Sequence, residues 1–171
     1  PVPQAAIDAQ TKTTVYHRTD AFYTTFQRCR ELLAPVFGCS NLPIILTSSG
    51  SGGMEAAVVN LTAEGDEVVT ISGGKFGERW DKLTRAYGCK VTTLEIEWGT
   101  APDPVAVRDV LSKCDNPKAL FFQANETSTG VKFPVEEIVR EVRKSFKGHI
   151  VVDAISSLGA HPMKMDEWGV D

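Results

Sequence analysis

The 171-residue sequence has no long hydrophobic run and no excess of basic residues. Its apolar runs are far shorter than the roughly 20 residues that a membrane-spanning helix needs, so we expect no membrane-embedded segment. Asp and Glu number 22 against 18 Lys and Arg, which gives a formal net charge of −4. Proteins that bind nucleic acid usually gather Lys and Arg on one face. The charge balance therefore argues against a nucleic-acid partner.

Cysteine and histidine are also sparse, and they form no pattern of metal ligands. The four cysteines are Cys29, Cys39, Cys89 and Cys114, and no two of them form a C-x-x-C pair. The three histidines are not paired at helical spacing, so we predict no metal site. The opening residues show no basic and then apolar secretory signal, and disulfides are rare in the cytosol. We therefore expect reduced thiols and a cytoplasmic protein.

Short apolar runs alternate along the chain with segments of helical periodicity. The runs that favour strands are 44–47, 67–71, 91–94, 119–122 and 149–152. The segments that favour helices are 20–37, 53–63, 75–87, 104–114 and 134–147. Unbroken Val, Ile, Leu and Phe runs are typical of strands covered on both faces. The pattern predicts one α/β domain over residues 1–171, with a mostly parallel sheet covered by helices.

Ligands of such folds bind at the carboxyl ends of the strands, so the residues that follow each strand matter most. The glycine- and serine-rich segment 47–53 runs into a helix, and Ser51, Gly52 and Gly53 stand at its start. Free N–H groups and the positive end of the helix dipole bind phosphate there without a basic side chain. The segment is neither a P-loop nor a dinucleotide fingerprint. A plain tight turn is the alternative interpretation.

Three further strand ends carry side chains suited to a ligand. Phe76 follows the second strand and could lie on a planar ligand, or be a core residue. The polar segment 123–130 supplies hydroxyl donors, or is simply a solvated loop. Asp153 ends the last strand, where a carboxylate needs a cation or a strong donor. A ligand's protonated nitrogen would meet that need, and a structural ion pair or helix cap would do so too.

Together these features match the requirements of pyridoxal 5'-phosphate, whose phosphate, ring face and ring nitrogen each need a partner. The sequence resembles the class V aminotransferases, most closely the alanine–glyoxylate and serine–pyruvate aminotransferases and their bacterial relatives. The resemblance lies in His17-Arg18 and in four segments of the chain. These segments are SGSGGMEA (49–56), GKFGER (74–79), NETSTG (125–130) and VDAISSLG (152–159). The resemblance implies the large domain of a fold-type I pyridoxal-phosphate transferase.

The resemblance also implies roles for particular residues. Ser51, Gly52 and Gly53 would bind the cofactor phosphate. Phe76 would stack on one face of the pyridine ring, and Ile155 would pack against the other face.

The same resemblance implies two polar contacts with the ring. Thr127 would form a hydrogen bond near the ring hydroxyl, and Asp153 would pair with the pyridinium nitrogen. Asp153 would also act in catalysis by stabilising negative charge through the ring. The lysine that holds the cofactor covalently would follow Asp171, and Lys164 is not assigned that role. The substrate-binding small domain would lie there too, so this chain alone is expected to be inactive.

The implied activity is amino transfer between a small amino acid, of the alanine or serine type, and a 2-oxo acid, of the glyoxylate or pyruvate type. A homodimer is expected, as in the relatives. One alternative is other class V chemistry such as cysteine desulfuration, although desulfurases usually stack a histidine where Phe76 stands. A second alternative is a non-catalytic phosphate-binding module that uses the glycine-rich turn alone.

Overall fold

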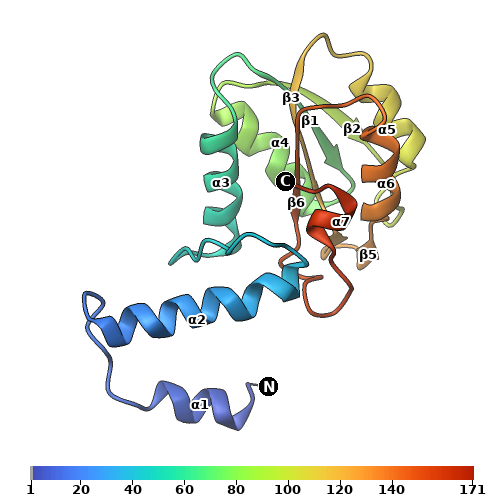
Figure 1. Cartoon of the computed structure of the whole chain (residues 1–171). Helices are drawn as coiled ribbons and strands as arrows, with labels where there is room; N and C mark the ends of the chain where they lie inside the picture. The colour runs from blue at the N-terminus through green and yellow to red at the C-terminus, as the bar shows by residue number, and fades with distance from the viewer. Residues whose placement is uncertain (1) are drawn as a thin grey trace.

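The computed structural model describes residues 2–171, and its central feature is a parallel sheet of four strands (Figure 1). The strands are β1 (Glu67–Ser72), β2 (Lys90–Glu95), β3 (Pro117–Gln123) and β6 (His149–Asp153), in the order β2-β1-β3-β6. All three neighbouring pairs are parallel. Four of the five predicted strands, and the predicted parallel sheet with helices, are confirmed.

Helices cover both faces of this sheet, as the unbroken apolar strands predict. The helices α3 (Gly50–Leu61) and α4 (Lys75–Ala86) lie on one face, where Val58 and Trp80 pack with Val68 of β1 and Phe121 of β3. The two aromatic rings of this cluster lie 4.9 Å apart between centroids. Burial of such side chains contributes about 1.5–3 kcal/mol each, so this face anchors both helices that reach the strand ends.

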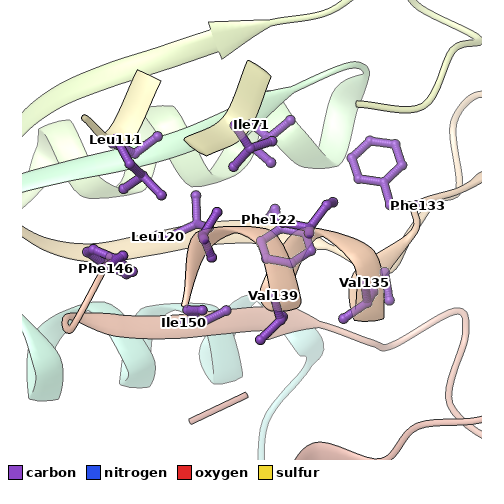
Figure 2. Close-up of a cluster of buried hydrophobic side chains, with 14 residues drawn as sticks. Ile71, Leu111, Leu120, Phe122, Phe133, Val135, Val139, Phe146 and Ile150 are labelled. Atoms are coloured by element: carbon purple, nitrogen blue, oxygen red, sulfur yellow. The ribbon is translucent and has the colours of Figure 1, made fainter. Parts of the chain in front are cut away.

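The other face is covered by α5 (Pro104–Leu111) and α6 (Val135–Val142). Figure 2 shows Leu111 of α5 and Val139 of α6 in the cluster of buried side chains that also contains Ile71 and Leu120 of the sheet. The start of α5 is fixed by the preceding Asp103, whose carboxylate accepts a hydrogen bond from the N–H of the second helical residue at 3.1 Å. Both helices use their apolar stripe to close the larger core.

The N-terminal helices α1 (Gln4–Gln10) and α2 (Asp20–Phe37) lie beside the α/β body (Figure 1). The range predicted for α2 is confirmed. It begins after Thr19, whose hydroxyl accepts a hydrogen bond from the N–H of Phe22 at 3.3 Å. It ends at Gly38, whose φ of 67° favours glycine. Of its residues only Ala34 is buried, so α2 contributes little to the core.

The predicted strand at 44–47 is wrong, because this segment forms neither strand nor helix. Ile44 has 83% of its surface exposed, and the segment pairs with no strand in the described part of the chain. The carbonyl groups of Leu42 and Pro43 accept hydrogen bonds from the Arg30 side chain instead. An apolar run predicts a buried strand only where a neighbouring strand accepts its backbone hydrogen bonds.

Other element bounds differ from the expected ones, and three short elements were not expected. The helix predicted at 53–63 begins at Gly50, while those predicted at 104–114 and 134–147 end at Leu111 and Val142. The apolar periodicity continues to Phe146 because that side chain still packs in the core after the helix has ended. The short elements are β4 (Asn125–Glu126), β5 (Val131–Lys132) and α7 (Met165–Trp168).

The strand order places a reversal point between β1 and β3. From β1 the chain passes to β2 on one side, and it then crosses to β3 on the other side. The segments that leave the carboxyl ends of two such strands diverge, and the crevice between them is the usual ligand site of open α/β sheets. Here those segments are the start of α4 and the β4–β5 hairpin.

Candidate functional site

The glycine-rich segment forms the first turn of α3. The helix begins at Gly50, so Ser51, Gly52 and Gly53 all lie within its first turn. The N–H groups of Gly52 and Gly53 donate to the carbonyl of Ser49, at 3.0 and 3.3 Å. Those of Gly50 and Ser51 have no acceptor in the described part of the chain, as is usual for the first residues of a helix. The free donors therefore belong to Gly50 and Ser51.

The start of α3 lies directly against Ile155, which follows β6. A Cβ on Gly50 would overlap the end of the Ile155 side chain, which would then have to move. Ile155 keeps 64% of its surface exposed. This exposed apolar side chain is available for contact with a ligand.

Phe76 is held in the first turn of α4, which packs closely on the end of β1. A Cβ on Gly77 would lie 2.6 Å from the carbonyl oxygen of Ile71 and 2.8 Å from the Cα of Ser72. Both neighbours are backbone atoms, so a side chain at Gly77 would push the helix away from the strand. The half-buried Phe76 ring takes its position from this contact.

Arg79, one turn along α4, connects the Phe76 ring with α3. Its guanidinium lies 5.1 Å from the centre of the Phe76 ring, and its Nη1 donates to the hydroxyl of Ser51 at 2.8 Å. Sequence reasoning assigned Arg79 no role. Its position three residues after Phe76, on the same helical face, was the available signal.

The first turn of α4 has no cap from its own neighbourhood. The residue before the helix is Gly74, and no side chain near it in sequence bonds to the free N–H groups. The N–H of Lys75 donates to the hydroxyl of Ser128 at 3.0 Å. Those of Phe76 and Gly77 donate to the two carboxylate oxygens of Glu126, at 3.4 and 3.0 Å. The β4–β5 hairpin therefore caps α4.

Thr127 connects this hairpin with the loop after β6. Its hydroxyl donates to the hydroxyl oxygen of Ser156 at 2.6 Å. The side-chain amide of Asn125 donates to the same oxygen at 2.9 Å. Sequence reasoning did not single out Ser156, because one serine among many in polar loops carries no signal.

Asp153 ends β6 and is partly buried. Its Oδ1 accepts a hydrogen bond from the N–H of Ile155 at 2.9 Å. Burial raises the pKa of Asp153, and the charge of Glu126 adds to the rise; the Ile155 N–H and the charge of Arg79 oppose it. No lysine or arginine of the described residues forms an ion pair with Asp153. A carboxylate in this state favours an added cation.

These contacts form a closed circuit around the carboxyl ends of the strands. Its links are Ser51 to Arg79, Phe76 to Glu126, Thr127 to Ser156, and Ile155 to Gly50. The structure thus brings all four expected segments together at one end of the sheet. This end of the sheet therefore presents helix N–H donors, an aromatic ring, an exposed apolar side chain and a carboxylate without an ion-pair partner.

Comparison with known proteins shows the family. The family described as aminotransferase class-V matches residues 5–171, and the chain belongs to this family. An uncharacterized aminotransferase of Methanocaldococcus jannaschii is 35% identical over 170 residues, which are 99% of this chain and 44% of that protein. The serine–glyoxylate aminotransferase of Hyphomicrobium methylovorum is 40% identical over 131 residues, covering 74% of this chain and 32% of that protein.

Solved structures agree with this assignment. The alanine–glyoxylate aminotransferase of Nostoc sp. superposes with a TM-score of 0.93 at 31% identity, covering 99% of this chain and 45% of that one. A cysteine desulfurase of Thermococcus onnurineus has a TM-score of 0.78 at 17% identity, covering 99% of this chain and 45% of that one, which shows a shared fold alone. The chain spans less than half the length of these relatives. The expected class V resemblance and fold are confirmed.

Two other features, a membrane-spanning helix and a metal-binding cluster, are not found among the described residues. None of the helices they form is long and apolar enough to cross a membrane. They contain no group of three or more His, Cys, Asp or Glu side chains placed to hold a metal ion. All four cysteines are free thiols, and Cys89 is buried.

Proposed function

We propose that residues 1–171 form the larger part of a pyridoxal-phosphate site in an aminotransferase. The observation that carries this proposal is the circuit of contacts at the strand ends. It connects an open helix start, an aromatic ring, a hydroxyl and a carboxylate without an ion-pair partner at the carboxyl ends of the strands. The family supports the proposal, because pyridoxal phosphate is the cofactor of class V aminotransferases.

The cofactor phosphate would bind at α3 and not at α4. Two helices begin at this end of the sheet, and each presents the positive end of its dipole. The start of α4 is already occupied by the Glu126 carboxylate, whereas the N–H groups of Gly50 and Ser51 are free. Gly52 and Gly53 complete the turn without side chains, and Arg79 adds a positive charge beside Ser51.

The cofactor ring would lie between Phe76 and Ile155. Thr127 would donate or accept a hydrogen bond at the ring hydroxyl, and Asp153 would hold a proton on the ring nitrogen. When bound, pyridoxal phosphate supplies an electron sink for breaking bonds at the α-carbon of an amino acid. Asp153 would keep the ring nitrogen protonated and positive, so that the ring could accept electron density from the α-carbon.

We propose that the whole protein extends beyond this chain. The lysine that binds the cofactor would follow Asp171, and a small domain would bind the substrate carboxylate. The chain spans less than half the length of its relatives, which supports this division. We also propose a homodimer in the cytoplasm. Residues 1–171 alone would then bind cofactor weakly and catalyse nothing.

The proposed reaction moves an amino group from a small amino acid, such as alanine or serine, to a 2-oxo acid, such as glyoxylate or pyruvate. The names of the Nostoc and Hyphomicrobium relatives support this substrate class. Cysteine desulfuration is the competing chemistry, since a desulfurase shares the fold. Phe76 at the stacking position favours amino transfer.

The test is to purify the protein as its gene encodes it and to add pyridoxal phosphate. We expect long-wavelength absorbance from bound cofactor and amino transfer from alanine or serine to glyoxylate or pyruvate. Sulfide release from cysteine at a higher rate would favour desulfuration. Binding of inorganic phosphate without any cofactor absorbance would favour a non-catalytic phosphate module.

The position of the covalent lysine gives a second test. Borohydride reduction followed by peptide mass spectrometry should place the cofactor on a lysine outside residues 1–171. Modification of Lys164, or of another lysine of this chain, would contradict the proposed division of the protein.

A further inference from the structure

We propose that Glu126 is a positioning residue, which caps α4 from the end of β3 and so fixes the Phe76 ring relative to Thr127. The inference rests on the proposed cofactor site and adds to it a residue that does not touch the cofactor itself. It concerns the only wholly buried acidic side chain in the described part of the chain.

The surroundings of Glu126 supply hydrogen-bond donors but no countercharge. Its side chain is 0% exposed, and it forms no ion pair with a described residue. Besides the N–H groups of Phe76 and Gly77, it accepts hydrogen bonds from the side-chain amide of Gln123 at 2.8 Å and from the N–H and hydroxyl of Ser128 at 3.1 and 2.5 Å. A buried carboxylate is stable only when its oxygens accept hydrogen bonds in this way.

The donors come from segments that are about 50 residues apart in the sequence. Phe76 and Gly77 belong to α4, while Gln123 and Ser128 flank Glu126 at the end of β3. Helix caps are normally local, because the capping side chain precedes the helix by a few residues. A local Ser or Asp before α4 would satisfy the helix equally well. Only the long-range cap also ties α4 to the hairpin.

The hydrogen bonds of Glu126 connect two residues of the proposed ring site. Phe76 donates its N–H to Glu126, and Thr127 is the next residue along the chain. A side chain on Gly74 would overlap the Glu126 carboxylate, so the helix start and the hairpin are in close contact. The Glu126 carboxylate therefore helps to position both the Phe76 ring and the Thr127 hydroxyl. Loss of its charge should change the geometry of the ring site as well as the stability of the fold.

Replacement of Glu126 by glutamine isolates this effect. The amide keeps the shape of the carboxylate but turns one acceptor oxygen into a donor, which would face an N–H of α4 or the amide of Gln123. The Oε1 of Gln123 is buried without a partner, so this side chain can turn to accept from the new amide. The N–H groups of Phe76 and Gly77 have no such substitute and must share one oxygen.

The experiment compares wild-type protein of full length with Glu126→Gln and with the control Glu67→Gln. Glu67 also accepts a backbone N–H, from Asn116 at 2.8 Å, but it lies at the opposite end of β1 from the site. Three quantities are measured. They are amide hydrogen exchange in residues 74–80 without cofactor, the circular dichroism of bound pyridoxal phosphate, and its dissociation constant.

We expect Glu126→Gln to speed exchange at the start of α4 about tenfold, because a hydrogen bond to a charged group is lost. It should also change the circular dichroism of the bound cofactor, which reports the asymmetry around the ring, and weaken binding about tenfold. Glu67→Gln should change none of the three quantities. If Glu126→Gln does not fold, Ser128→Ala should change the circular dichroism and affinity in the same direction at smaller amplitude, because it removes the donor nearest to the carboxylate. Exchange at Lys75 is left out of this comparison, because the Ser128 hydroxyl also accepts the Lys75 N–H.

Two failures are distinguishable. If wild-type protein shows no bound-cofactor signal, the proposed function fails and this inference fails with it. If wild-type protein shows the signal while Glu126→Gln lowers only thermal stability, with unchanged circular dichroism and affinity, Glu126 is merely structural and the inference alone is overturned. Unchanged exchange at the start of α4 would overturn it equally.

Discussion

Replacement of Asp153 by asparagine separates the proposed pairing with the ring nitrogen from every other property of the site. The amide has the shape of the carboxylate and can still accept the Ile155 N–H at the end of β6. What it loses is the negative charge. Asp66 provides a matched control, because it is also partly buried and accepts one backbone N–H, from Ala63 at 2.9 Å, far from the strand ends that form the site.

The expected loss of affinity follows from the surroundings of Asp153. A hydrogen bond to a charged group contributes about 1.5–3 kcal/mol, which corresponds to about a 10- to 150-fold change in a dissociation constant. Asp153 is only partly buried and lies in the field of Arg79, so part of its charge is already screened. We therefore expect the lower part of this range, about 10- to 30-fold. Turnover should fall further, about 100-fold or more, because the charge acts where the reaction develops electron density.

The same substitution has the opposite effect on cofactor-free protein. Burial raises the pKa of Asp153 above its ordinary value near 3.8, so the folded state holds this proton more tightly than the unfolded chain. The contribution of Asp153 to the free energy of unfolding therefore falls as the pH rises from that ordinary value through the raised pKa. This contribution stays lost at neutral pH. Asp153→Asn removes this loss. It should stabilise the cofactor-free protein at pH 7 and flatten its pH dependence in the acidic range.

Three measurements on the full-length protein test these expectations: cofactor titration, turnover with saturating cofactor, and urea unfolding as a function of pH. Asp66→Asn should leave affinity and turnover close to wild type. The reasoning is refuted if Asp153→Asn binds cofactor within about threefold of wild type and keeps more than a tenth of its turnover. It is refuted as well if the cofactor-free variant is less stable at neutral pH.

Other substitutions test the remaining parts of the site. Gly77→Ala should lower the free energy of unfolding by about 1–3 kcal/mol in urea, because the added Cβ would overlap backbone atoms of β1. Gly53→Ala, with nothing within 4 Å of its Cβ, should stabilise by about 0.5–1 kcal/mol; equal effects of the two would contradict the packing argument. Ile155→Ala should leave stability within about 0.5 kcal/mol, since the side chain is exposed, yet weaken cofactor binding about fivefold. Unchanged affinity would remove Ile155 from the ring site. Arg79→Met should raise the pKa of Asp153 further, so the acidic limb of cofactor binding against pH should move to higher pH; a shift to lower pH would contradict this.

The sequence predicts the strand ends well, because doubly covered parallel strands are visible as unbroken apolar runs. Phe76, Thr127 and Asp153 each follow such a run, and the fold brings their elements to one end of the sheet. The segment 44–47 has the same composition and is not a strand. An apolar composition indicates that a segment can be buried in a sheet, but it does not indicate whether a partner strand is present.

The early start of α3 was not predictable from local preferences. Glycine and serine are poor helix formers, so propensity places the start of the helix at Gly53. Packing decides otherwise, because Met54 and Val58 are buried against the sheet and the turn before them continues the same helix. The difference matters for the site, since it moves the free N–H donors to Gly50 and Ser51.

The contact between Glu126 and α4 had no signal in the local sequence. A glutamate in a polar segment is usually solvated, and nothing local relates it to a helix that begins 51 residues earlier, at Lys75. The sheet order creates the relation, because β1 and β3 are neighbours and their carboxyl ends meet. Long-range caps of this kind become visible only once strand order is known.

The distribution of charge at the strand ends supports both the proposed cofactor and its proposed orientation. The start of α3 is open to an anion, with Arg79 beside it, while Asp153 and Glu126 make the opposite part of the site negative. A ligand with a phosphate at one end and a protonated ring nitrogen at the other complements both parts at once. The reversed orientation would place phosphate next to the Asp153 carboxylate, where like charges repel. A phosphate without a cationic end would leave Asp153 unpaired, so the proposed site would favour pyridoxal phosphate over a simple anion.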